Sequence, residues 1–131
     1  MAIPLQSLSG TEVLRRGGIN AQSTAETWFN FDGTNPTTTS TSGAVPANHI
    51  ITMLSIIVCE QGNANIQLNL WSLVSSVQTY ILHHQLISAK GTFVWNERFS
   101  LMGGDTLRIN TVGSANVDIW YSYICLLYTS P

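Results

Sequence analysis

The chain has 131 residues, of which 44% are hydrophobic and only 9% are charged, and its formal net charge is -2. This length suits one domain with a substantial core and is too short for two ordinary domains. The five Lys and Arg residues are scattered along the chain, which argues against the basic stripe of a nucleic-acid-binding protein. Because disordered chains pair low hydrophobicity with high charge, the composition also excludes intrinsic disorder.

Neutral polar residues take the place of the charged coat of an ordinary domain, in which about 25% of residues are charged. Such surfaces are common on extracellular proteins, yet the opening sequence MAIPLQSLSG lacks the basic and apolar regions of a signal peptide. The most apolar stretch, residues 50–58, is too short to span a bilayer, so we expect no membrane partner. A virion protein, made in the host cytoplasm and released by lysis, fits both the neutral polar surface and the lack of a signal peptide. Burial of the neutral surface by other subunits is a compatible interpretation.

The first 23 residues show no sustained hydrophobic period, so we expect an extended N-terminal arm over residues 1–23. Within it, Glu12 to Arg15 favours a short strand at most, and the sequence RRGGIN indicates a turn. A disordered tail would contain fewer apolar residues. We therefore expect the arm to become ordered by docking to a partner or a neighbouring subunit, through Ile3, Leu5, Leu8, Val13 and Leu14.

Residues 24–131 are expected to form a single domain, with a Thr/Ser-rich loop at 32–43 that has no core-forming residue. Stretches with strand character alternate with turn signals at 25–31, 49–60, 64–74, 77–88, 92–101, 105–112 and 116–128. No amphipathic helix of three turns is evident. This pattern predicts an all-β fold, an antiparallel β-sandwich of the jelly-roll type.

The sequence Gly103-Gly104-Asp105 raises the question of a phosphate loop or a catalytic acid. A phosphate loop needs glycines that open a helix, whereas these precede the strand-like sequence TLRIN. The next acid towards the C-terminus, Asp118, alternates with apolar neighbours and is expected on the outer face of a strand. We interpret the glycines as a turn in which Asp105 fixes backbone N–H groups. We therefore expect no catalytic residue and no enzyme.

The histidines and cysteines form no metal-binding pattern. His83 and His84 are consecutive, so their side chains are expected to point to opposite faces of a strand. A symmetric site with one histidine from each of three chains remains an alternative. Cys59 and Cys125 are far apart within apolar stretches, which favours buried free thiols over a disulfide. We expect no metal and no cofactor.

Aromatic residues are the candidates for contacts with other molecules. Trp71 and Trp120 stand on the parity opposite to the main apolar series of their strands, which indicates an interface or a ligand rather than the core. We favour a subunit interface over a sugar site, and we place Tyr121 and Tyr123 in the same interface. The stretches 49–60 and 116–128 are apolar on both parities, so one core leaves surplus apolar surface that self-association would cover.

Two segments, VPANHIITMLSIIVCEQGNANIQLNLW and FSLMGGDTLRINTVGSANVDIWYSYICL, resemble a recurrent module of tailed-bacteriophage structural proteins. The resemblance covers about residues 44–127 and rests on three motifs: Val45-Pro46-Ala47, Gly104-Asp105-Thr106-Leu107 and Ser122-Tyr123-Ile124. Cys59-Glu60 departs from it, because the phage pattern usually carries Asn there. The turn from leucine to Gly-Asp also resembles the trimeric jelly rolls of complement- and cytokine-like proteins.

The resemblance implies a non-enzymatic virion component. Its most favoured form is a capsid decoration (cement) protein that stabilises the particle as a homotrimer and contacts other virion proteins such as the major capsid protein. A neck or tail component, or a fibre knob that binds a receptor glycan, is the alternative. No nucleic acid is expected as a partner.

Overall fold

The computed structural model describes residues 11–37, 39–113 and 116–128. They form an all-β fold, as the sequence predicts. The strands are β1 (Thr11–Gln22), β2 (Thr27–Trp28), β3 (His49–Glu60), β4 (Ile66–Val74), β5 (Val77–Ile87), β6 (Thr92–Trp95), β7 (Phe99–Met102), β8 (Thr106–Val112) and β9 (Val117–Leu127). The stretch 92–101 is therefore two short strands instead of the single strand expected.

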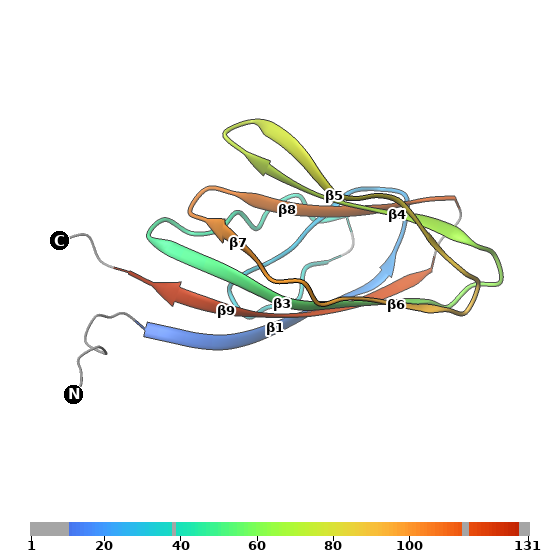
Figure 1. Cartoon of the computed structure of the whole chain (residues 1–131), viewed down its shortest axis with the longest axis horizontal. Coiled ribbons are helices and arrows are strands. Elements are labelled where there is room, and N and C mark those ends of the chain that lie inside the picture. Colours follow the sequence, from blue (N-terminus) through green and yellow to red (C-terminus); the bar gives the residue numbers. More distant parts are fainter. Residues whose placement is uncertain (1–10, 38, 114–115, 129–131) are drawn as a thin grey trace.

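Two antiparallel sheets pack face to face, as Figure 1 shows. The larger sheet has the order β1-β9-β3-β6, with β7 pairing the first half of β3, and the smaller sheet has the order β2-β8-β4-β5. Consecutive strands thus often lie in different sheets, which is the topology of a jelly roll. The predicted β-sandwich of jelly-roll type is confirmed.

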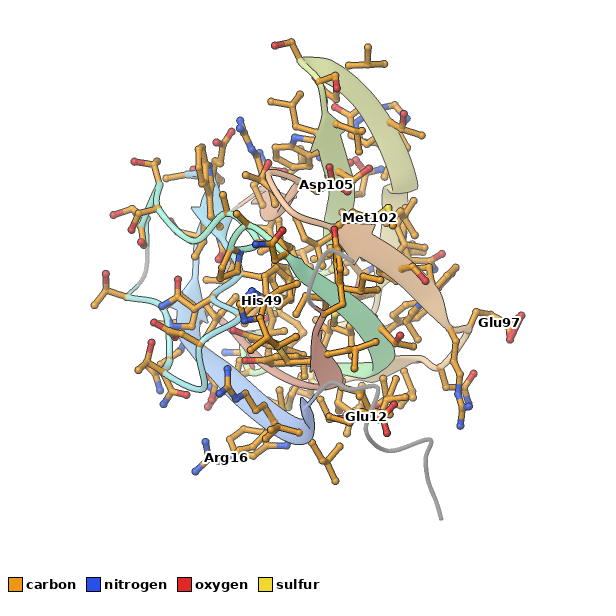
Figure 2. The ribbon with its side chains drawn as sticks, turned by 90° about the vertical axis from the view of Figure 1, so that its left-hand side faces the viewer. Glu12, Arg16, His49, Glu97, Met102 and Asp105 are labelled. Carbon is orange, nitrogen blue, oxygen red and sulfur yellow. The ribbon has the colours of Figure 1, made fainter. Side chains whose placement is uncertain are left out.

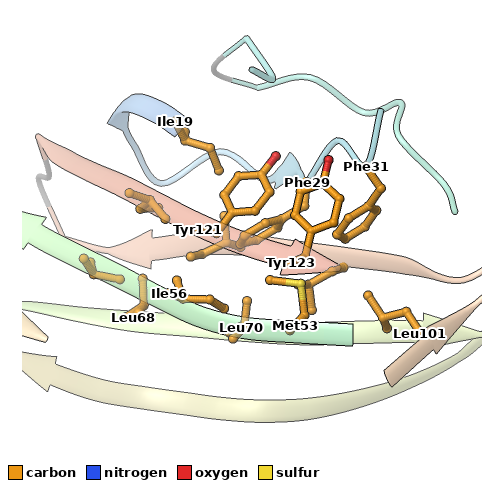
Figure 3. Packing of buried hydrophobic residues seen from close by; sticks show 14 of the residues in the cluster. Ile19, Phe29, Phe31, Met53, Ile56, Leu68, Leu70, Leu101, Tyr121 and Tyr123 are labelled. Carbon is orange, nitrogen blue, oxygen red and sulfur yellow. The ribbon is translucent and has the colours of Figure 1, made fainter. Parts of the chain in front are cut away.

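The core fills the space between the two sheets, because alternate residues of each strand point inward. Tyr121 and Tyr123 of β9 are its largest side chains and pack edge-on against Phe29 and Phe31, with ring centroids 4.6 and 5.2 Å apart for the pairs Phe29–Tyr121 and Phe31–Tyr123 (Figure 3). Ile56 of β3 and Leu107 of β8 are also buried. Both sheets therefore contribute to one continuous core.

The hydroxyl groups of the two core tyrosines anchor the segment that follows β2. Tyr121 Oη donates to the Asn30 carbonyl at 2.8 Å and accepts the Asn30 N–H at 3.1 Å. Tyr123 Oη accepts the Gly33 N–H at 3.0 Å. Burial raises the pKa of both tyrosines, since the phenolate would lose its hydration. The start of the Thr/Ser-rich loop is thereby fixed to the larger sheet.

Strand β1 differs from the expected arm. It runs over Thr11–Gln22 and pairs with β9 along its length, so it is an edge strand of the larger sheet and longer than the expected strand at Glu12 to Arg15. The predicted turn at RRGGIN is wrong, because these residues lie inside β1. The expected docking residues Ile3, Leu5 and Leu8 lie outside the described residues, whereas Val13 and Leu14 are exposed on β1.

Two glycines in β1 are covered by aromatic rings of β9. Gly17 pairs with Tyr121 and Gly18 with Trp120. A Cβ at Gly17 would lie 2.4 Å from the Tyr121 ring, and one at Gly18 would lie 3.1 Å from the Trp120 ring. Since adjacent residues face opposite sides of a sheet, one ring lies on the core face and the other on the outer face. The glycines therefore make room for rings, and they do not form a turn.

Candidate functional site

The outer face of the larger sheet is unusually apolar for a surface. The residues of β9 that alternate with its core residues point outward, and β3 presents a second apolar series on the same side. The sequence predicts a β3 buried on both faces. In the structure only one face is buried within the chain, and Ile57 on the other is exposed. The surplus apolar surface expected from the sequence is thus found on this face.

One end of this outer face, called here the apolar end, consists of Leu14, Ile50, Met102, Ile124 and Leu126. The strand register places Leu14 beside Ile124, and Leu126 beside Ile50, which in turn lies beside Met102. Leu14 is 70% exposed and Met102 is 53% exposed. Figure 2, a view from one end of the sandwich, shows Glu12 and Arg16 low in the picture and Met102 above them, and the strand register places Glu12 beside Leu126. The apolar end therefore presents several large side chains to solvent.

The other end of the same face holds a groove of about 320 Å3. Its side-chain lining includes Trp120 and Asp118 of β9, Ile57 and Cys59 of β3, Asn20 of β1 and Asn35 of the Thr/Ser-rich loop. Trp120 is 49% exposed, and the guanidinium carbon of Arg16 lies 5.6 Å from the centroid of its ring. Unlike the apolar end, this groove combines one aromatic platform with several polar groups.

A β-bulge in β1 shapes the polar side of the groove. The pairing of β1 with β9 slips between Ile19 and Gln22, and Ala21 adopts a left-handed backbone with φ of 57°. The Ala21 N–H donates to Asp118 Oδ1 at 3.0 Å, while Gln61 Nε2 donates to Asp118 Oδ2 at 2.6 Å. The bulge therefore fixes the carboxylate of Asp118 in place.

Asn35 reaches the groove because its loop is held at several points. Asp32 Oδ1 accepts the N–H of Thr34 at 3.0 Å and its hydroxyl at 2.5 Å, and these hydrogen bonds lower the pKa of Asp32. Asn35 Oδ1 then accepts the N–H of Gly18 at 3.0 Å. The groove residues Asn20, Asn35, Ile57 and Cys59 were not anticipated from the sequence, since neither the bulge nor the return of the loop leaves a local signal.

The expected interface residues do not come together. Trp120 is exposed, but Tyr121 and Tyr123 are fully buried, so their assignment to an interface is wrong. Alternation explains this result, because they belong to the inward series of β9 together with Ile119. Trp71 faces outward from β4 in the other sheet, yet it is only 7% exposed and contacts Tyr80 at a ring distance of 5.8 Å. Of the four residues, only Trp120 offers an open ring.

His83 and His84 do not point to opposite faces as predicted. Their rings are stacked at a centroid distance of 4.0 Å. The cause is a bulge in β5, in which both residues lie opposite Asn69 and His84 has a φ of 58°. Asn69 Oδ1 accepts the His84 N–H at 2.8 Å. Strand periodicity fails here because a bulge adds one residue to the alternation.

The segment Gly103-Gly104-Asp105 is a turn between β7 and β8. Asp105 Oδ2 accepts the Met102 N–H at 2.8 Å, and the Asp105 N–H donates to the Met102 carbonyl at 2.9 Å. Gly104 has a φ of 92°, a conformation that favours glycine. These two hydrogen bonds close the turn, which is the role predicted from the sequence, and the Asp105 carbonyl also accepts the Val45 N–H at 2.9 Å.

Cys59 and Cys125 are free thiols; Cys125 is buried in the core, whereas Cys59 is half-buried on the outer face. Within residues 11–37, 39–113 and 116–128, no group of three or more His, Cys, Asp or Glu side chains could hold a metal ion. The same residues contain no helix that is long and apolar enough to cross a membrane.

No protein-family model matches the chain, and no curated protein matches it. Solved structures with a similar shape include the VP2 subviral particle of infectious bursal disease virus, with a TM-score of 0.45 and 10% identity over 88% of this chain and 33% of the viral chain. The globular domain of zebrafish complement 1qA has a TM-score of 0.47 and 12% identity over 93% of this chain and 98% of that domain. Eiger TNF from S. frugiperda has a TM-score of 0.39 and 11% identity, covering 89% and 93% of the two chains. The chain spans about a third of the viral chains that it matches.

Proposed function

We propose that this protein is a non-enzymatic virion structural protein that self-associates through the apolar end of its larger sheet, most simply as a homotrimeric decoration protein of a bacteriophage capsid. The single observation that carries the self-association is the exposure of Leu14 and Met102 within a cluster of apolar neighbours. Such a cluster on a surface with few charges invites association unless a partner covers it. The virion setting is supported by the neutral composition and by the phage-like sequence motifs.

Closed dimers are the commonest assembly in general. The preference for a trimer therefore rests on the sequence resemblance to trimeric jelly rolls alone. Contact with other virion proteins such as the major capsid protein is assigned to the N-terminal segment, whose residues Ile3, Leu5 and Leu8 are apolar. A truncated chain lacking residues 1–10 is expected to fold and to be absent from purified particles. Normal incorporation of that chain would contradict the assignment.

Self-association is tested by light scattering coupled to size exclusion at micromolar concentration. We expect a trimer for the wild type and monomers for Leu14→Asp, because the substitution places a charge within the proposed contact, at its most exposed side chain. Leu86→Asp is the matched control: Leu86 is 57% exposed on β5, in the other sheet, and its substitution should leave the trimer intact. A monomeric wild type, or an intact trimer in Leu14→Asp, would refute the proposed surface.

Location is tested separately by electron microscopy of intact particles. Density for the protein distributed over the capsid faces supports the decoration role. Density confined to the neck, the tail or the tips of fibres would instead favour the alternative roles. Oligomeric state and location are independent measurements, so failure of one leaves the other interpretable.

A further inference from the structure

We propose that the groove beside Trp120 is a binding site for a neutral hexose unit of a glycan. The inference does not depend on self-association, because the groove lies at the opposite end of the sheet face from the apolar end. Ser55 of β3 and Ser122 of β9 separate the two regions, with their hydroxyl groups 3.2 Å apart, and Arg16 of β1 lies beside Ser122.

The shape of the groove suits a small ligand. The groove of about 320 Å3 is at the lower end of the volumes that small-ligand sites occupy, which are about 300–1,000 Å3. Its aromatic wall is the ring of Trp120, which rests on Gly18 of the neighbouring strand. Because Gly18 has no side chain, the ring can lie against β1 and still present open surface to a ligand. A hexose has an apolar C–H face that stacks on such a ring.

The polar groups that surround the ring suit the hydroxyl groups of a sugar. The Asp118 carboxylate receives hydrogen bonds from Ala21 and Gln61, and a carboxylate has about four lone-pair sites in all. Its remaining capacity suits the adjacent hydroxyl groups of a sugar. Asn35 uses its oxygen to hold the Gly18 N–H, so its NH2 group is the part that it can offer to a sugar oxygen. Each hydroxyl group of a neutral sugar can both donate and accept, so it can donate to the Asp118 carboxylate and accept from the NH2 group of Asn35.

The groove is built from separate parts of the chain. Ala21 is a non-glycine residue in the left-handed region, a conformation that costs about 1–2 kcal/mol and tends to occur at binding sites. That strained residue belongs to the bulge that orients Asp118. The loop carrying Asn35 is separately pinned by the core tyrosines. Separate parts of the chain thus converge on one groove.

The charge of the site selects among glycans. Asp118 is the one carboxylate in the described lining of the groove, and the guanidinium carbon of Arg16 lies 5.6 Å from the centroid of the Trp120 ring. The two opposite charges offset each other, so the groove has no net charge with which to favour an ionised sugar. We therefore expect neutral hexose-containing glycans as ligands, and no gain in affinity from a sialic or uronic acid.

The test begins with a glycan array that carries neutral and sialylated members, probed with the intact protein, followed by calorimetric titration of the best neutral glycan. We expect saturable binding that Trp120→Ala weakens by about tenfold or more, since a factor of ten corresponds to the loss of one modest contact. Tyr80→Ala is the matched control: Tyr80 is 46% exposed on β5, and its removal should leave the affinity unchanged. Binding should also slow alkylation of Cys59, which lines the groove.

Three outcomes would overturn the proposal. The first is an array with no saturable neutral glycan. The second is equal loss of binding in Tyr80→Ala and Trp120→Ala, which would place the site elsewhere. The third is dissociation of the oligomer by Trp120→Ala, measured by light scattering on the same samples, which would make the groove part of a subunit contact. Failure of self-association itself would leave the glycan measurement unaffected.

Discussion

The close contact between Gly17 and Tyr121 leads to a sharp prediction about stability. In Gly17→Ala the new methyl group would meet the Tyr121 ring at 2.4 Å, which is far inside van der Waals contact. The ring is fully buried between Phe29 and Phe31 and its hydroxyl holds both backbone groups of Asn30. It therefore has no open space to move into, and one of these contacts must be lost.

The magnitude follows from the parts of that contact. Overpacking a core costs about 1–3 kcal/mol. Losing the two hydrogen bonds of the Tyr121 hydroxyl adds about 0.5–1.5 kcal/mol for each bond. Replacing glycine by alanine returns about 0.4–1 kcal/mol through the unfolded chain. We expect Gly17→Ala to lower the free energy of unfolding by about 3 kcal/mol, the centre of the range of about 1–6 kcal/mol that these parts span.

Gly18→Ala is the matched control, because it places the same methyl group on the other face of the same strand. There the nearest ring atom is 3.1 Å away, and it belongs to Trp120, which is half-exposed and can shift outward. We expect a change of less than about 1 kcal/mol, since the unfolded-chain term offsets a mild clash. Urea unfolding at one fixed protein concentration, followed by circular dichroism, measures both variants.

A double-mutant cycle tests the assigned cause. In a Tyr121→Leu background the ring and its hydroxyl are absent, so Gly17→Ala should cost much less than it does in the wild type. If the two glycine variants lose equal stability, or if Gly17→Ala costs the same with and without the Tyr121 ring, the steric explanation is refuted.

Three further predictions concern the core, the turn and the titration of the tyrosines. Ile56→Ala and Leu107→Ala should each lower the free energy of unfolding by about 2–4 kcal/mol, because each leaves a cavity at a buried position; a loss below 1 kcal/mol in urea unfolding would contradict this packing. Asp105→Asn should cost less than either, since an amide oxygen can still accept the Met102 N–H; a functional loss with the fold intact would contradict a pure turn role. The pKa of Tyr121 and Tyr123 is raised in the folded state, so their contribution to stability is complete below the unfolded pKa of about 10 and declines as the pH rises toward the folded pKa. The urea midpoint should therefore fall less steeply with pH, between about pH 8 and pH 12, in Tyr121→Phe than in the wild type. Equal slopes in the two proteins would exclude Tyr121 as a cause.

The sequence alone determined the class of the fold and most of the strands. Alternation with a period of two is a property of neighbouring residues, and it identifies β4 and β9 without any knowledge of their partners. The turn at Gly104 was also predictable, because glycine and an acid before a strand are a local signal. The apolar second face of β3 was visible as a pattern, although the sequence could not say whether the chain itself would cover it.

Tertiary structure decided what depends on strand pairing. Gly17 and Gly18 resemble a turn in the sequence, and only the pairing with Tyr121 and Trp120 explains why a strand contains them. Bulges are equally hidden, because an extra residue changes the register without changing the composition. The bulge in β5 brings His83 and His84 to one side, against the expected alternation.

The candidate groove shows the same division between sequence and structure. The alternation of residues 116–128 predicted that Trp120 faces away from the core, and the composition of the Thr/Ser-rich loop predicted its polar character. That Asn35 of this loop meets Gly18 of β1 beside Trp120 depends on the anchoring of the loop by core tyrosines and on the register of β1 against β9. These contacts join residues far apart in the sequence, and side-chain packing in the folded core selects them, which is why only the tertiary structure could reveal them.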